Sequence, residues 1–139
     1  MNNRVRHWVA PALLTVVAAA HQPAQARVAE LADPPATTFG CTLQQDQLRR
    51  AIIAGLAVRG WTAADLETGK LVGKVNVRGK HVLEVSIRYT PTSFDVDYLT
   101  STNLNYREKN GVRQIHPNAN TWMQNVNQDI LAQAQIACN

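Results

Sequence analysis

Apolar residues along the chain recur first at the helical period. Leu48, Ile52 and Leu56 lie four residues apart, whereas the charged residues Asp46, Arg49 and Arg50 fall at other positions of the helical turn. This spacing collects the apolar side chains on one face of a helix and the charged ones on the other. The segment is therefore predicted to be a surface helix that packs on a core.

Residues at both ends of this segment mark where the helix begins and ends. Thr42, followed three residues later by Gln45, has the spacing of a capping box, which satisfies two free backbone N–H groups at a helix start. Gly60 stands where a left-handed residue closes a helix, and Trp61 after it can fold back onto the last turn. We predict a helix from about 43 to 59.

From Leu71 the apolar period changes from 3.6 to 2. Apolar and polar residues alternate over 71–77 and 83–89, and again over 94–99. Strict alternation is typical of strands with one buried and one solvated face. The chain therefore predicts a three-stranded antiparallel meander.

The register of the meander follows from keeping all apolar side chains on one face. A two-residue loop at Gly79 and Lys80 would place Val75 opposite Glu84, and a slip of one residue moves every side chain to the other face. We therefore predict a three-residue loop at 78–80 and a four-residue loop at 90–93. The predicted pairs are Val75 with Leu83, Leu71 with Ile87, Tyr89 with Phe94, Ile87 with Val96, and, on the outer face, Lys74 with Glu84 and Arg88 with Asp95.

The last part of the chain combines a polar stretch with a second helix. Asn110-Gly111 is a strong turn signal, so a small fourth-strand hairpin is expected within 100–118. Helical spacing returns from about Asn118 and continues almost to Cys138. The order of elements is αβββα, and the expected fold class is α+β, with two antiparallel helices packed on one face of a three- to four-stranded antiparallel sheet.

The N-terminal residues have the three parts of a secretory signal peptide. A basic start containing Arg4 and Arg6 precedes an apolar stretch over 8–20 and the cleavage motif Ala24-Gln25-Ala26. The apolar stretch has 13 residues, whereas a spanning helix needs about 20. We predict a cleaved signal peptide at 1–26, a flexible leader segment at 27–40 and a single domain at 41–139, with a periplasmic location and no stable membrane anchor.

Charge and cysteine content narrow the function classes. Without residues 1–26 the chain has 12 lysines and arginines against 10 aspartates and glutamates, a net charge of +2, so no basic footprint for a nucleic acid is expected. Cys41 and Cys138 are the only cysteines. Because disulfides persist in oxidising compartments, we predict that these two residues pair and join the start of the first helix to the end of the second.

Two histidines remain once the predicted signal peptide is removed, and they are the first candidates for a catalytic or metal-binding site. His81 follows the first hairpin loop, and His116 precedes the second helix. With Asp97 or Ser101 they would form an acid/base or metal site, but the spacing matches no HExxH or CxxC motif and a metal needs three or four ligands. We favour the alternative that both rings hold loop and helix ends by hydrogen bonding, and we assign no catalytic residue, metal or cofactor.

Amide and aromatic side chains in the irregular segment are the candidate binding surface. Binding residues concentrate on loops held by a rigid scaffold, and such side chains recognise sugars or peptide backbone. The alternative is that these polar residues only form turns. The candidate ligand-binding residues are Asn103, Asn105, Tyr106, His116 and Asn118.

Several short motifs occur in a fixed order over about 48–130. They are Ala51-Ile52-Ile53, Arg59-Gly60-Trp61, Gly69-Lys70-Leu71-Val72, Arg78-Gly79-Lys80-His81, Glu84-Val85-Ser86-Ile87, Tyr89, Ser101-Thr102-Asn103-Leu104, Ile115-His116-Pro117-Asn118 and Trp122. Together they resemble a family of small, uncharacterised cell-envelope proteins of Gram-negative bacteria, many of which are lipoprotein-like. The resemblance implies an envelope location and a compact αβββα domain, with no activity attached to it. Lipoprotein members carry a lipidated cysteine directly behind the signal, where this chain has Ala24-Gln25-Ala26.

The function expected from these features is that of an exported, non-enzymatic binding or accessory module of the cell envelope, acting on an envelope protein or glycan. Two alternatives stay open: a small periplasmic hydrolase or metal-dependent enzyme that uses His81 and His116, and an inhibitor of a wall-degrading enzyme.

Overall fold

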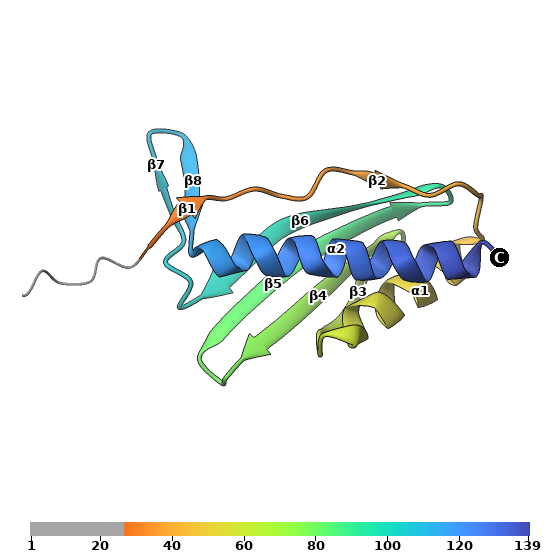
Figure 1. The fold of residues 1–139 in the computed structure, drawn as a ribbon, viewed down its shortest axis with the longest axis horizontal. Coiled ribbons are helices and arrows are strands. Elements are labelled where there is room, and N and C mark those ends of the chain that lie inside the picture. The colour runs from red at the N-terminus through yellow and green to blue at the C-terminus, as the bar shows by residue number, and fades with distance from the viewer. Residues whose placement is uncertain (1–26) are drawn as a thin grey trace, which may run out of the picture.

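A computed structural model describes residues 27–139, so the predicted signal peptide lies outside the described residues. Two helices and eight strands follow one another along this part of the chain (Figure 1). In chain order they are β1 (Ala29–Glu30), β2 (Thr37–Thr38), α1 (Gln45–Val58), β3 (Thr62–Glu67), β4 (Lys70–Val77), β5 (His81–Thr90), β6 (Ser93–Thr102), β7 (Arg107–Lys109), β8 (Val112–Ile115) and α2 (Pro117–Ala137).

The described chain is an α+β fold with two antiparallel sheets. The larger sheet has five strands in the order β2-β6-β5-β4-β3, and α1 and α2 pack against it. The smaller sheet has the order β1-β8-β7, and its β7–β8 hairpin projects beside the start of α2 (Figure 1). The predicted fold class is therefore confirmed, but the sheet is larger than the three to four strands expected.

The register of the central meander agrees with the sequence. Val75 pairs with Leu83 across β4 and β5, and Ile87 pairs with Val96 across β5 and β6. The predicted outer-face ion pairs also form, with 3.1 Å between Lys74 and Glu84 and 2.7 Å between Arg88 and Asp95. Facing apolar sets and facing opposite charges thus favour the same register.

Two details of the meander differ from the prediction. Thr90 pairs with Ser93, so the loop between β5 and β6 has two residues, Pro91 and Thr92, instead of four. Strand β6 continues to Thr102 rather than ending at 99. It does so because a register shift opposite Glu84 and Val85 lets the ladder continue past Leu99.

Strand β3 was not predicted, and its exposure explains why. All six of its residues are exposed, so no apolar side chain marks a buried face. It forms the edge of the sheet through backbone pairing with β4. The turn between β3 and β4 contains Gly69, whose φ of +77° suits glycine. In the sequence, Gly69 was the one residue that indicated a hairpin between β3 and β4.

The first helix begins later than predicted. α1 starts at Gln45, and its capping contact joins the Gln44 N–H to the Gln47 side chain at 2.9 Å, in place of the predicted box at Thr42. Leu43 is buried, and its N–H donates to the Pro91 carbonyl. The chain is therefore held in an extended form until residue 44.

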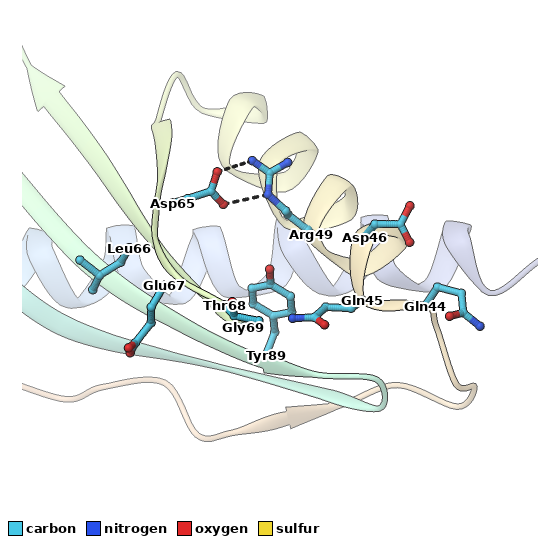
Figure 2. A pocket seen from close by; sticks show the side chains of 10 residues that line it. All are labelled: Gln44, Gln45, Asp46, Arg49, Asp65, Leu66, Glu67, Thr68, Gly69 and Tyr89. Carbon is cyan, nitrogen blue, oxygen red and sulfur yellow. Dashed lines mark hydrogen bonds and ion pairs between the residues drawn. The ribbon is translucent and has the colours of Figure 1, made fainter.

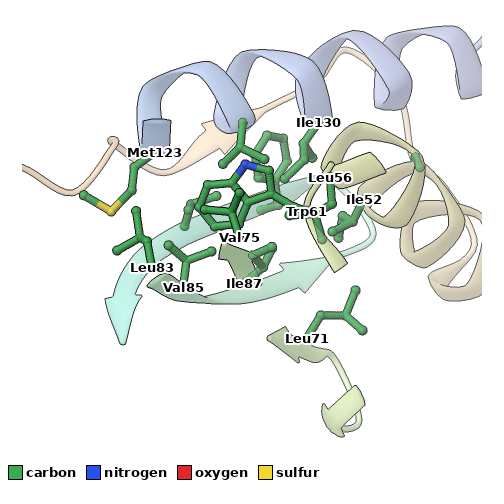
Figure 3. Packing of buried hydrophobic residues seen from close by; sticks show 14 of the residues in the cluster. Ile52, Leu56, Trp61, Leu71, Val75, Leu83, Val85, Ile87, Met123 and Ile130 are labelled. Carbon is green, nitrogen blue, oxygen red and sulfur yellow. The ribbon is translucent and has the colours of Figure 1, made fainter. Parts of the chain in front are cut away.

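The core lies between the helices and the inner face of the larger sheet. Figure 3 shows Ile52 and Leu56 of α1 and Met123 and Ile130 of α2 above the apolar side chains of the sheet. The two helices meet at Gly55, where an added Cβ would lie 2.6 Å from the Cα of Ile130. Glycine at this position therefore allows the two helix backbones to approach closely.

Residues 29–39, which we call the strap, pack on the core, although the sequence predicts a flexible leader over 27–40. Leu31 and Phe39 are buried. Two asparagines of α2 hold the strap: the Asn120 side chain bonds Ala32 N and Glu30 O, and Asn127 bonds Thr37. Single apolar residues without a period gave no signal of this packing.

Asp33 fixes the strap to the rest of the fold. Its Oδ1 accepts from the Tyr98 N–H at 2.7 Å, and its Oδ2 accepts from Arg113 at 2.7 Å. One carboxylate thus satisfies a backbone donor at the edge of β6 and pairs with a cation of β8. The strap in this way connects the two sheets.

The predicted disulfide is present. Cys41 and Cys138 are bonded, with 5.8 Å between their Cα atoms and 97 residues of separation. The bond joins the segment before α1 to the end of α2, as expected for helices that run in opposite directions. In the chain-entropy account, closing a loop of this length stabilises the fold by about 4 to 5 kcal/mol.

We predict that Gly55→Ala destabilises the domain, although alanine favours helix by about 1 kcal/mol over glycine. The added methyl group has backbone of α2 as its neighbour, so the helices must separate, with an expected net loss of about 1 to 3 kcal/mol. Urea denaturation measures the change. Gly40→Ala is the control, because a Cβ there meets nothing within 4 Å. A Gly55→Ala protein as stable as the control would contradict the close packing.

Candidate functional site

One surface hollow lies beside the start of α1 and has a volume of about 640 Å³. We call it the Arg49 groove (Figure 2). Arg49 donates to both oxygens of Asp65, at 2.8 and 2.6 Å. This hydrogen bonding lowers the pKa of the Asp65 carboxyl and raises that of Arg49. The residues lining it are Gln44, Gln45, Asp46, Arg49, Asp65, Leu66, Glu67, Thr68, Gly69 and Tyr89.

Each charged side chain that lines the Arg49 groove already has an ion-pair partner. Besides the Arg49–Asp65 pair, Asp46 pairs with Arg50 at 2.6 Å, and Glu67 lies 3.6 Å from Lys70. A charged ligand would have to break these contacts. The groove is therefore the weaker candidate despite its size.

The second hollow brings the two histidines together. It has a volume of about 350 Å³ and lies where the β4–β5 loop, the turn after β6 and the start of α2 meet. We call it the histidine hollow. Its lining residues are Val77, Arg78, His81, Leu104, His116, Asn118 and Trp122.

His81 is held by the turn that follows β6. Its Nδ1 lies 2.8 Å from the backbone oxygen of Asn103. Because a carbonyl oxygen only accepts, the Nδ1 of His81 carries the proton in this contact, and Nε2 of the neutral ring is an acceptor. The Asn103 side chain in turn donates to the Lys80 carbonyl at 2.7 Å. These two bonds join the β4–β5 loop to the turn after β6.

His116 is the N-cap residue of α2. Its Nδ1 accepts from the Asn118 N–H at 3.2 Å, so Nε2 carries the proton when the ring is neutral. The His116 N–H donates to the Leu104 carbonyl at 2.7 Å. Both histidine rings thus hold loop and helix ends by hydrogen bonding, which is the role that we favoured from the sequence. Both also line the same hollow.

The other predicted site residues lie elsewhere. Asn103 and Asn105 have φ of 57° and 54°, a left-handed conformation that asparagine tolerates better than most residues. Tyr106 stacks on Tyr98 with 4.7 Å between ring centroids. Of the five predicted binding residues, the hollow therefore contains His116 and Asn118.

The proposed third members of a histidine site do not join it. Ser101 bonds the Tyr98 hydroxyl at 2.9 Å, and Asp97 pairs with Arg88 at 2.8 Å. Burial and the neighbouring Asp95 raise the pKa of the Asp97 carboxyl. Within residues 27–139, no three His, Cys, Asp or Glu side chains are grouped so that they could hold a metal ion.

Sequence reasoning missed four residues of the hollow. Val77 falls in a predicted strand, Arg78 in a predicted loop, Leu104 in the polar stretch and Trp122 in the predicted second helix. The alternating and helical periods report burial and do not report which side chains border a hollow. Arg78 gave no signal either, because its left-handed backbone, which glycine or asparagine usually adopts in a turn, is seen only in the structure.

No helix in the described part of the chain is long and apolar enough to cross a membrane. In comparisons with known proteins, no family model, no curated protein and no solved structure matches this chain. The support for the candidate site therefore comes from the geometry of this structure.

We predict that His116→Ala destabilises the domain by about 1 kcal/mol, because the Asn118 N–H loses its capping acceptor. His116→Asn should retain most of the stability, since asparagine is a strong N-cap residue. Thermal and urea unfolding of both variants measure the difference. Equal stability of the alanine and asparagine variants would contradict the capping role.

Proposed function

We propose that this chain is an exported, non-enzymatic binding module of the cell envelope and that the histidine hollow is its ligand site. The observation that carries the proposal is that seven side chains from three separate parts of the fold border one hollow. They combine an indole, two imidazoles, an amide and a guanidinium. Such a mixture of aromatic surface with a few polar groups is typical of ligand sites.

Hydrogen bonds support the idea that the hollow is formed before a ligand arrives. The contact of His81 with Asn103, that of Asn103 with Lys80 and that of His116 with Leu104 hold its walls. A site that is already ordered avoids part of the entropic cost of binding. The volume of about 350 Å³ is at the small end for ligand pockets. We therefore propose a small ligand, or one end of a larger one such as an envelope glycan or peptide.

The signal-peptide pattern and the disulfide support export. Residues 1–26 have the pattern of a cleavable signal peptide. The Cys41–Cys138 bond is of a kind that persists outside the reducing cytosol. We propose a periplasmic location, as the resemblance to the envelope family implies, but without the lipid anchor of its lipoprotein members, because Ala24-Gln25-Ala26 stands where those members carry the lipidated cysteine.

The histidine hollow predicts a specific footprint of binding. When low-molecular-weight fractions of envelope extract are titrated into the isotope-labelled, disulfide-bonded protein, amide NMR signals of His81, Leu104 and Asn118 should shift. Asn118→Ala should weaken the response, because its side chain lines the hollow. Gln128→Ala is the control, as an exposed residue of the same helix. Shifts confined to the Arg49 groove would contradict the site.

Export predicts a defined mature form. The protein recovered from a periplasmic fraction should begin at Arg27, as shown by its intact mass, and should be two mass units lighter than the reduced chain because Cys41 and Cys138 are bonded. An uncleaved chain retained in the cytosol with free thiols would contradict the proposed location.

A second candidate function is acid/base catalysis. The hydrogen bonds assign opposite neutral tautomers to the two rings, so Nε2 of His81 accepts and Nε2 of His116 donates. Paired acceptors and donors of this kind suit general acid/base chemistry. Recovery of the ligand after the titration separates the two functions: a binding module returns it unchanged, whereas a hydrolase returns its cleavage products.

A further inference from the structure

The hydrogen-bond partners of the arginines distinguish Arg78 from its neighbours in the fold. Six other arginines between residues 49 and 113 each hydrogen-bond a side chain of the same chain. For Arg78, no such partner occurs within residues 27–139. Its side chain instead lines the histidine hollow. The hollow is therefore bordered by a cation that the fold does not neutralise.

The backbone of Arg78 is a second, independent observation. Its φ is 57°, in the left-handed region that costs a non-glycine residue about 1 kcal/mol or more. Gly79, next to it, has φ of 66°, and glycine or asparagine at position 78 would make the same loop at lower cost. Backbone strain of this kind is concentrated at functional sites. The turn alone therefore does not explain why an arginine occupies position 78.

The remaining lining residues limit what the guanidinium would bind. None of the seven is an aspartate or glutamate, while Val77, Leu104 and Trp122 present apolar surface. The ring nitrogen of His116 that does not cap α2 is a further donor. A guanidinium matches a carboxylate in a bidentate geometry. A single cation beside an apolar wall suits one negative charge attached to an apolar body.

We infer that the histidine hollow recognises a carboxylate on a small apolar body, with Arg78 binding the carboxylate and Trp122 and Leu104 contacting the body. This inference rests on the proposed function and names its ligand class. A carboxylate next to an apolar surface is present at the C-terminus of a peptide that ends in an apolar residue, and in an acidic sugar, where the C–H face of the ring is the apolar surface. The experiment has one arm for each source.

The test uses the disulfide-bonded protein and four probes. N-acetylphenylalanine carries the carboxylate on an apolar body, and its primary amide has the same body without the charge. Glucuronate represents an acidic sugar, and inorganic phosphate represents an anion without a body. NMR titration gives the affinity of each probe and the residues whose signals shift.

The expected result is that N-acetylphenylalanine or glucuronate shifts the signals of His81, Leu104 and Asn118. The carboxylate should improve affinity about tenfold or more over the amide, in line with a charge-assisted hydrogen bond. Whichever acid binds more tightly identifies the source. Phosphate binding as tight as that of the acids would overturn the inference, because it would make the apolar wall irrelevant.

Two variants in one loop isolate the role of Arg78. Arg78→Asn removes the charge but keeps a residue that accepts the left-handed backbone, so the fold should be preserved. It should bring the affinity for the acid down to that for the amide. Lys80→Asn removes an equal charge from a residue that does not line the hollow, and it should leave the preference for the acid intact. Equal losses in the two variants would overturn the inference in favour of general electrostatic attraction.

Failure of the inference and failure of the proposed function give different results. If acid and amide bind in the hollow with equal affinity, the inference of a carboxylate ligand is wrong, but the proposed binding site is still supported. If the envelope extract shifts the NMR signals of residues in the hollow and no probe does, the inferred ligand class is again wrong, and the proposed binding site is still supported. If neither extract nor probes shift these signals, both the inference and the site are wrong.

Discussion

The close approach of α1 and α2 is the constraint on which the rest of the structure depends. Gly55 leaves no room for a side chain against Ile130, and the Cys41–Cys138 bond holds the far end of α2. These two contacts determine where α2 lies over the sheet (Figure 1). Because the first turns of α2 contribute His116, Asn118 and Trp122 to the histidine hollow, the position of the helix also determines the shape of the candidate site.

Polar contacts then complete the fold around α2. Asn120 and Asn127 bond the strap, and Asp33 links the strap to β6 and β8. Asn103 joins the loop before β5 to the turn after β6. Asn103, Asn120 and Asn127 therefore have structural roles. Arg78 is the one arginine or lysine that lines the histidine hollow, and these bonds leave its side chain without a partner in the described residues.

The sequence predicted the meander and the disulfide well because both depend on strong local signals. Alternation and facing charges specify the register of β4, β5 and β6, and two cysteines in one chain allow a single intramolecular pairing. β3 and the strap gave no such signal, since β3 is wholly exposed and the strap contributes single apolar residues. Their positions follow from backbone pairing and long-range contacts, which a local pattern does not encode.

The candidate site could be predicted only in part, for the same physical reason. His81 and His116 were linked in advance as rare titratable residues at the ends of predicted elements. Trp122 and Leu104 have the spacing or burial of core residues, so their second role at a hollow depends on how three distant segments meet. Arg78 is a loop residue in sequence, and its conformation and lack of a partner become visible only in the folded chain.

We propose that ligands bind at the histidine hollow and not at the larger Arg49 groove. Intermolecular nuclear Overhauser effects between a bound acid and the protein test this proposal most directly. We expect contacts from the apolar body of the ligand to the Trp122 indole and the Leu104 methyl groups. Contacts to Tyr89 and Leu66, which line the Arg49 groove, would contradict it.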